Sequence, residues 1–292
     1  MRRLFALALV TVALVTGCAA GSGGESRTDT APQPSAAPPT TPEEPPDESR
    51  AIELVGLWRV SGAAGESDKT WLRLEAGQFQ LWRDCGMITG SWNAGKRVFL
   101  AAVNGASGGC VGSAPPEIPW LGAVTAYEPD EAGWQLTDES GAVMASLAID
   151  GAPEPIDTAD ESYAEPPVID DAVRAAFQPG ASLPEPLVPA TAAELHGRWN
   201  PVDAPAASKA MVEFRDSGTW GGSDGCNSSG GRWAVEGEGE FFATSGPSTL
   251  IGCDNVPVPE WVALARLAGF DGTELVLLDV GGGELGRLHP AD

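Results

Sequence analysis

The stretch Glu53-Leu54-Val55-Gly56-Leu57-Trp58 is repeated later in the chain as Glu194-Leu195-His196-Gly197-Arg198-Trp199. The two tryptophans are 141 positions apart (199 − 58). The same offset separates five further pairs of residues. Because tryptophan and cysteine are rare, a constant spacing through them indicates an internal duplication. The pairs are Cys85 and Cys226, Trp92 and Trp233, Trp120 and Trp261, Leu136 and Leu277, and Asp138 and Asp279.

Two parts of the chain depart from this offset. Cys110 and Cys253 are 143 positions apart (253 − 110), which indicates two loops that differ in length by two residues. Between Trp71 and Phe79 the apolar alternation of the first copy runs one residue out of phase with that of the second. A β-bulge or a slip in the alignment would explain this second departure.

Each copy has the size of a domain, about 100 residues. We therefore predict one domain over residues 51–150 and a second over residues 192–292. Residues 151–191 are rich in proline and acidic residues, so we expect a linker there that few contacts cross. Within this linker a short helix is expected from Asp170 to Phe177, because paired aspartates suit a helix start.

Short apolar runs separated by Gly, Asp and Ser turns predict β-strands within each copy. In the second copy these runs lie at 211–214, 232–235, 240–243 and 275–278. One helix is also expected in each copy, where apolar residues follow a proline at helical spacing. These residues are Trp261, Leu264, Ala265 and Ala268 in the second copy, and Trp120, Ala123, Val124 and Tyr127 in the first. The predicted fold class is α+β and mostly β, with two small antiparallel sheets or partial barrels that each pack one helix.

The first residues have the pattern of a bacterial export signal. A basic start, Met1-Arg2-Arg3, precedes an apolar run over residues 4–15, which is shorter than the roughly 20 residues that span a bilayer. The run ends in Val15-Thr16-Gly17-Cys18, which resembles the lipobox of lipoproteins. We therefore predict a signal peptide over residues 1–18, lipidation of Cys18, and a lipid-anchored protein at the extracytoplasmic face of the cell membrane.

The composition of the remaining chain bounds its partners. Residues 19–50 hold too little apolar surface to fold, so we expect a disordered tether there. The chain has 17 Lys+Arg against 41 Asp+Glu, a formal net charge of −24. Such a polyanion repels nucleic acid and anionic lipid headgroups. We expect no nucleic-acid partner, and we expect the lipid on Cys18, rather than charge, to hold the protein at the membrane.

The cysteines predict two disulfides. The lipid takes Cys18, which leaves four cysteines outside the cell, and an even number of exported cysteines indicates disulfide bonds. Three pairings of the four are possible in principle. Because each copy of a duplicated domain should carry the same internal bridge, the repeat favours Cys85 with Cys110 and Cys226 with Cys253.

The second copy resembles the META domain of HslJ-like envelope proteins over residues 192–292. The matching motifs are Leu195-x-Gly197-x-Trp199, Phe214, Gly218, Asp224-Gly225-Cys226-Asn227, Gly231-x-Trp233 and Thr249-Leu250-Ile251-Gly252-Cys253. The first copy is a degenerate version, which keeps Leu54-x-Gly56-x-Trp58, Cys85-Gly86, Gly90-x-Trp92 and Cys110. The resemblance implies tandem META-like domains with a barrel-like fold. It links the chain to heat-shock response, novobiocin resistance and surface lipoproteins, a family without a settled chemistry.

Catalytic and metal-binding patterns are weak in this sequence. Gly221-Gly222-Ser223-Asp224-Gly225 fits the Gly-x-Ser-x-Gly pattern of a nucleophile elbow, but the residues that follow cannot begin a helix as that elbow requires. Only His196 and His289 could serve as an imidazole base, and neither has metal-ligand spacing. The acidic residues show no calcium-loop pattern. We expect no catalytic residue, no metal and no cofactor.

Aromatic residues supply the one candidate binding surface. Most of the ten tryptophans form pairs at the repeat offset, which is typical of core positions. Trp71 and Trp82 have no counterpart in the second copy, so a glycan or protein surface is expected there. The leading hypothesis is a non-catalytic envelope lipoprotein that binds an envelope protein or glycan, or supports envelope stress tolerance. The alternatives are a cell-wall-acting enzyme that uses carboxylates and a purely structural spacer.

Overall fold

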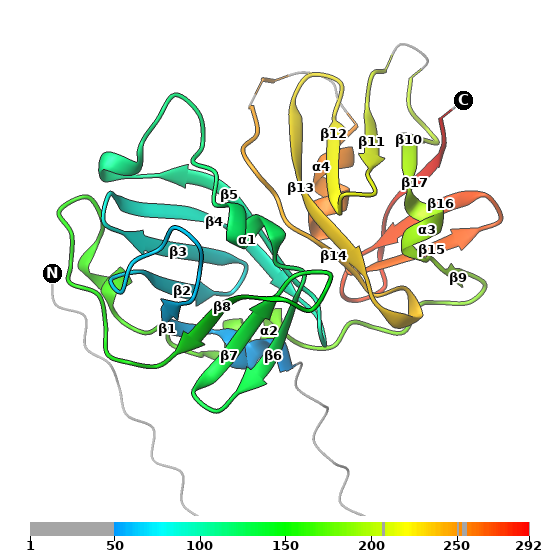
Figure 1. Ribbon diagram of the computed structural model, residues 1–292. Helices are drawn as coiled ribbons and strands as arrows, with labels where there is room; N and C mark the ends of the chain where they lie inside the picture. The colour runs from blue at the N-terminus through cyan, green and yellow to red at the C-terminus, as the bar shows by residue number, and fades with distance from the viewer. Residues whose placement is uncertain (1–49, 206–207, 250, 253–255, 292) are drawn as a thin grey trace, which may run out of the picture. The chain divides into compact units, whose positions relative to one another are not determined.

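The computed structural model describes residues 50–291, apart from residues 206–207, 250 and 253–255, and is mostly β (Figure 1). All described residues fall in one compact unit of the chain, Glu44–Asp292. They form one antiparallel sheet of eight strands, a second of nine strands, and several short helices. Cys18, the predicted signal peptide and the predicted tether lie outside the described residues.

The first sheet has the strand order β5-β4-β3-β2-β1-β8-β7-β6. Its edge strands β5 and β6 also meet, because Val98 bridges Ala126 and the Phe99 amide donates to the Thr125 carbonyl. The sheet therefore curves back on itself. Its strands are β1 (Gly56–Ser61), β2 (Trp71–Glu75), β3 (Gln78–Arg83), β4 (Gly86–Ala94), β5 (Phe99–Ala106), β6 (Ala126–Asp130), β7 (Gly133–Thr137) and β8 (Val143–Ala148).

The second sheet repeats this order as β14-β13-β12-β11-β10-β17-β16-β15 and adds β9 at its edge. Here too the ends meet, where Glu240 bridges Leu267. The extra strand β9 belongs to the predicted linker. The strands are β9 (Val188–Pro189), β10 (Gly197–Pro201), β11 (Met211–Phe214), β12 (Thr219–Ser223), β13 (Ser228–Val235), β14 (Phe241–Ala243), β15 (Leu267–Asp271), β16 (Glu274–Leu278) and β17 (Glu284–Pro290).

Details of the two sheets agree at the repeat offset. The indole nitrogen of Trp58 donates to the Leu54 carbonyl at 2.8 Å, and that of Trp199 donates to the Leu195 carbonyl at 2.8 Å. The β7–β8 pairing shifts register after Leu136, and the β16–β17 pairing shifts after Leu277. Equivalent bulges and equivalent side-chain bonds are what two copies of one folding unit would retain.

The phase difference around Trp71 comes from two loops of compensating length. Trp58 pairs with Leu72 on β2, whereas Trp199 pairs with Val212 on β11, so the first copy has one residue more between these strands. The turn that follows β2 is one residue shorter than the turn after β11, which restores the offset at Phe79. The phase difference is therefore a one-residue shift in the alignment of the two copies between these loops, and not a β-bulge.

Short helices connect the strands. Two of them, α1 (Pro119–Ala123) and α4 (Val258–Leu264), lie where helices were expected after Pro119 and near Pro259. The stripe expected in the first copy is wrong at its end, because α1 stops at Ala123 and Tyr127 lies on β6. The expected linker helix is present as α2 (Asp171–Ala176), which Asp170 caps by accepting the Val173 amide. The others are η1 (Arg50–Leu54), η2 (Gly108–Cys110), η3 (Glu161–Ala164), α3 (Ala192–Leu195) and η4 (Gly237–Gly239).

The buried face of α4 differs from the expected one. Val258 and Val262 are fully buried, whereas Leu264 is 52% exposed and Trp261 is half-buried. The expected stripe included Ala268, but the helix ends at Leu264 and Ala268 lies on β15. Because α4 ends at Leu264, it cannot carry an apolar stripe that extends from Trp261 to Ala268. Val258 and Val262, which are four residues apart, pack on the core instead.

The two sheets contact each other directly. The Glu236 carboxylate accepts the backbone amides of Lys96, Arg97 and Val98 at 2.8–3.0 Å. The Arg232 guanidinium donates to the carbonyls of Gly122 and Val124. The expectation that few contacts cross between the repeats is therefore wrong, because buried and charge-assisted hydrogen bonds join them.

Candidate functional site

A cavity of about 540 Å³ lies where both sheets and the linker meet. The first sheet contributes the β4–β5 turn, residues 93–96, and the linker contributes residues 176–183. The second sheet contributes residues around η4 and the start of β15. The volume lies within the range of small-molecule sites in proteins, about 300–1,000 Å³.

Cationic side chains in this cavity come from three distant segments: Arg50, Lys96 and Arg266. Lys96 pairs with Glu240 at 3.5 Å, and the Arg50 guanidinium lies 5.4 Å from the centre of the Trp134 ring. Arg266 is half-buried and donates to its neighbouring carbonyl, Ala265, at 2.9 Å. Burial lowers the pKa of Arg266, and among the described residues no carboxylate pairs with it.

The acidic residues of the cavity are Glu240 and Glu238. Glu238 is exposed, has no ion-pair partner within the described part of the chain, and has a left-handed backbone with φ of 62°. A non-glycine residue in this region costs on the order of 1–3 kcal/mol and is more frequent at functional sites. Gly239 brings the chain so close to β15 that a Cβ there would lie 2.6 Å from the Ala268 carbonyl. That close approach positions Glu238 at the cavity.

Apolar side chains complete the lining, with Phe177 and Leu183 from the linker and Phe242 from β14. The Phe177 ring packs against Trp92 with ring centres 5.7 Å apart. Leu183 packs on a small apolar cluster of the second sheet. The linker therefore forms one wall of the cavity, which the sequence did not indicate because proline-rich segments are usually spacers.

Tyr127 holds one segment of the cavity wall by a hydrogen bond. Its hydroxyl donates to the carbonyl of the cavity residue Gly95 at 2.8 Å, and burial raises the pKa of Tyr127 to about 12. The unfolded chain therefore loses this proton at lower pH than the folded chain does. Stability from this group is complete below pH 10 and is lost as pH rises to about 12, by up to about 3 kcal/mol.

This pH dependence can be measured by following tyrosinate absorbance during an alkaline titration. One ionisation step near pH 12 is expected, and it should disappear in Tyr127→Phe. The chain's other tyrosine supplies the control, since Tyr163→Phe should retain that step. A step near pH 12 that survives Tyr127→Phe would contradict the assignment.

The two tryptophans expected to form a binding surface are buried instead. Trp71 and Trp82 are 3% and 5% exposed and face each other on adjacent strands β2 and β3. Linker residues around η3 cover them, and the Arg73 guanidinium donates to the Glu165 carbonyl at 2.9 Å to hold that segment. These rings therefore form an apolar layer between the sheet and the linker and offer no exposed platform.

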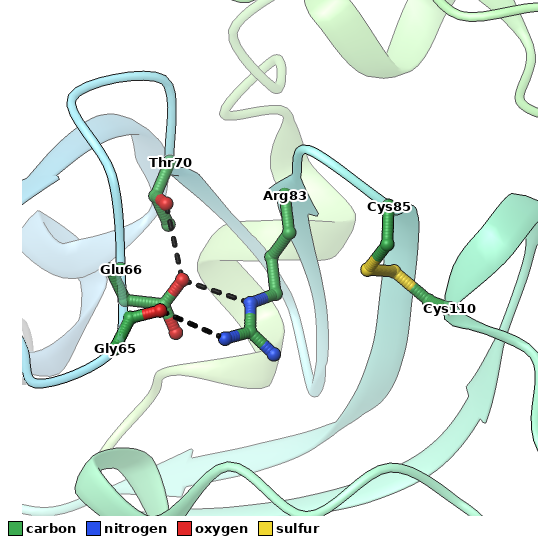
Figure 2. Close-up of a disulfide and its surroundings, with 6 residues drawn as sticks. All are labelled: Gly65, Glu66, Thr70, Arg83, Cys85 and Cys110. Atoms are coloured by element: carbon green, nitrogen blue, oxygen red, sulfur yellow. Dashed lines mark hydrogen bonds and ion pairs between the residues drawn. A yellow bond between two sulfur atoms is a disulfide. The ribbon is translucent and has the colours of Figure 1, made fainter.

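Cys85 and Cys110 form the disulfide that the repeat predicted, with Cα atoms 4.9 Å apart. Beside it lies the buried carboxylate of Glu66, which accepts from Arg83 at 2.9 Å and from Thr70 at 3.1 Å (Figure 2). The indole nitrogen of Trp120 donates to the other oxygen at 2.7 Å. The sequence did not single out Glu66. Its hydrogen bonds are all made within the protein, which is typical of a structural group.

Cys226 is also disulfide-bonded. Its predicted partner Cys253 lies outside the described residues, so that pairing stays a prediction. The turn that carries Cys226 is held by its neighbours. Asp224 accepts the Asn227 amide at 2.6 Å, and Asn227 in turn bonds the backbone of Ile251 through both its side-chain oxygen and nitrogen. The Asp-Gly-Cys-Asn motif therefore ties the end of β12 to the segment leading to α4.

The remaining candidates for catalysis have structural partners. Ser223 donates to the Asn227 carbonyl at 2.9 Å and accepts the Gly225 amide at 3.0 Å. His196 lies 3.0 Å from an Asp216 oxygen, and His289 contacts the Pro290 carbonyl. Neither histidine is bonded to the serine in the residues that the structure describes.

In the described part of the chain no group of three or more His, Cys, Asp or Glu residues is placed to hold a metal ion. Nor do those residues include a helix long and apolar enough to cross a membrane. No protein-family model, curated protein or solved structure matches the chain.

Proposed function

We propose that the chain is a non-catalytic envelope lipoprotein, anchored by lipid at Cys18, that binds a small ligand in the cavity between its two META-like domains. The observation that carries this proposal is the cavity itself, which combines a half-buried arginine, unpaired acid and aromatic walls. Polar and apolar surface line the cavity in about equal measure, and charged groups placed beside apolar walls are typical of ligand sites.

The strand arrangement supports the assignment of two META-like domains. Each sheet repeats the same order of eight strands, and each repeat carries one short helix between its fifth and sixth strands, α1 or α4. The Asp224–Asn227 turn has a clear structural role in the second copy. These features favour a duplicated fold. Because Trp71 and Trp82 are buried, the cavity is a better candidate for binding than a flat glycan surface is.

Two other functions are less well supported. A cell-wall-acting enzyme that uses carboxylates would need two free carboxyl groups at its site, but of the two in the cavity Glu240 is paired with Lys96 at 3.5 Å. The Ser223 hydroxyl, which a serine hydrolase would use, is engaged by backbone groups. A purely structural spacer would have no use for cavity charges without an ion pair, as Arg266 and Glu238 are in the described part of the chain. Glu238 in particular adopts a strained conformation that a spacer has no reason to retain.

The proposal is tested with the mature chain purified in detergent from the membrane fraction. It is incubated with the small solutes of an envelope extract, and bound compounds are identified by mass spectrometry. At least one compound should be enriched on the wild type and lost from Ser182→Trp, whose indole would fill the cavity. Ser113→Trp on an exposed loop is the matched control and should retain the compound. Cys18→Ser should lose its membrane attachment.

Two results would contradict the proposal. If no compound distinguishes the wild type from Ser182→Trp, the chain is not a small-ligand binder and the spacer is favoured. If Cys18→Ser stays in the membrane fraction as firmly as the wild type, the lipid anchor is wrong.

A further inference from the structure

We infer that the cavity takes a zwitterion of the amino-acid type, a free amino acid or a short peptide with an apolar side chain. This inference rests on the proposed function and specifies its ligand. Arg266 would bind the ligand carboxylate, Glu238 would bind its ammonium group, and the walls at Phe177 and Phe242 would receive its side chain.

Arg266 is the best placed of the cationic residues to bind an anion. Lys96 already pairs with Glu240, and the exposed Arg50 lies over the Trp134 ring. Arg266 makes one side-chain hydrogen bond to a carbonyl among the described residues, which leaves most of its five donors unused. A half-buried guanidinium with free donors is suited to bidentate recognition of a carboxylate.

Glu238 supplies the opposite charge. It lines the same cavity as Arg266, yet no ion pair within 4.0 Å joins the two in the described structure. Two residues of opposite charge that line one cavity without pairing can both be satisfied by one ligand that carries both charges. A ligand with only a negative charge would be repelled by Glu238, and a ligand with only a positive charge would be repelled by Arg266.

The apolar part of the lining determines which kind of side chain the ligand should carry. Phe177 is held by Trp92, and Phe242 lies beside the glutamate-bearing turn on β14. Burial of an apolar side chain against these rings adds affinity in proportion to its area. We therefore expect phenylalanine-type ligands to bind better than glycine.

The test is calorimetric titration of the whole mature chain with four compounds. Phenylalanine and the dipeptide phenylalanyl-alanine carry both charges, N-acetylphenylalanine lacks the ammonium group, and phenylalaninamide lacks the carboxylate. At least one of the two zwitterions should bind at least tenfold more tightly than the two singly charged compounds. The stronger of the two identifies a free amino acid or a peptide as the source.

Variants connect each charge to its residue. Arg266→Met should weaken zwitterion binding at least tenfold without weakening phenylalaninamide, and Arg266→Lys should recover part of the loss. Glu238→Gln should weaken zwitterion binding without weakening N-acetylphenylalanine, and Glu238→Gly, which relieves the left-handed backbone, should do so with no loss of stability. Arg215→Met and Glu213→Gln alter an ion pair that does not line the cavity and should leave binding unchanged.

The outcomes separate this inference from the proposed function. If all four compounds bind equally, or no zwitterion binds, the inference is overturned, while a compound captured from the extract would still support ligand binding. If neither a zwitterion nor any captured compound requires the open cavity for binding, the inference and the proposed function are both contradicted.

Discussion

Replacing Cys85 and Cys110 together by serine is expected to lower the free energy of unfolding by about 3–4 kcal/mol. The bond closes a loop with a sequence separation of 25 residues, and its loss gives the unfolded chain more conformational entropy. The loop contains the whole of β4 and β5, and Arg83, which contacts the buried Glu66, lies just before it (Figure 2). Loss of the bond should therefore destabilise the edge of the first sheet.

Urea unfolding followed by tryptophan fluorescence measures this effect. The control is Ser113→Ala, an exposed change just beyond Cys110, which should alter stability by less than about 0.5 kcal/mol. The second bridge at Cys226 stays in place in the double variant. A loss below about 1 kcal/mol would show that this disulfide contributes little to the folded state.

Gly231→Ala is expected to cost about 3 kcal/mol or to prevent folding of the second sheet. A Cβ at this position would overlap the Thr244 carbonyl, which is backbone and cannot move independently of the sheet. That same carbonyl accepts the indole nitrogen of the buried Trp220 at 2.9 Å, so the added methyl group also breaks a buried hydrogen bond. The Gly-x-Trp motif thus requires glycine for close approach of the chain.

Thermal unfolding of Gly231→Ala against Gly122→Ala tests this explanation. A Cβ at Gly122 on α1 would meet no atom within 4 Å, so that variant should melt close to the wild type. The repeat makes a further comparison possible. Gly90 lies at the equivalent position of the first copy, where a Cβ would overlap the Ala102 carbonyl and the Phe79 ring, so Gly90→Ala should be similarly harmful. A melting temperature for Gly231→Ala equal to that of Gly122→Ala would be incompatible with this packing.

Much of the fold could be predicted because it is encoded by local spacing that occurs twice. The 141-residue offset anticipated equivalent positions such as Trp58 and Trp199, whose indole bonds are the same. It also selected the pairing of Cys85 with Cys110. Duplicated spacing constrains topology because both copies must place the same residues on the same strands.

Burial against other parts of the chain could not be predicted in the same way. Trp71 and Trp82 lie on the outer face of β2 and β3, and alternation correctly implies that this face is not the sheet's own core. It contains no information about what covers that face. The linker does so here, and the energy of that contact comes from residues 81 to 93 positions away in the chain (163 − 82 and 164 − 71), such as Tyr163 and Ala164. The prediction of an apolar stripe on α4 was wrong for a related reason. The length of the helix determines which of its residues reach the core.

The sequence by itself determined a mostly β duplication, the cysteine pairing of its first copy and the positions where glycine or tryptophan recur. Only the tertiary structure decided that the repeats are joined through Glu236 and Arg232, and that a charged cavity lies where they meet the linker. No local sequence pattern around Arg266 or Glu238 identifies them as site residues. Their shared cavity depends on how distant segments pack. The hydrophobic periodicity of a single segment does not predict contacts between side chains that lie far apart in the sequence.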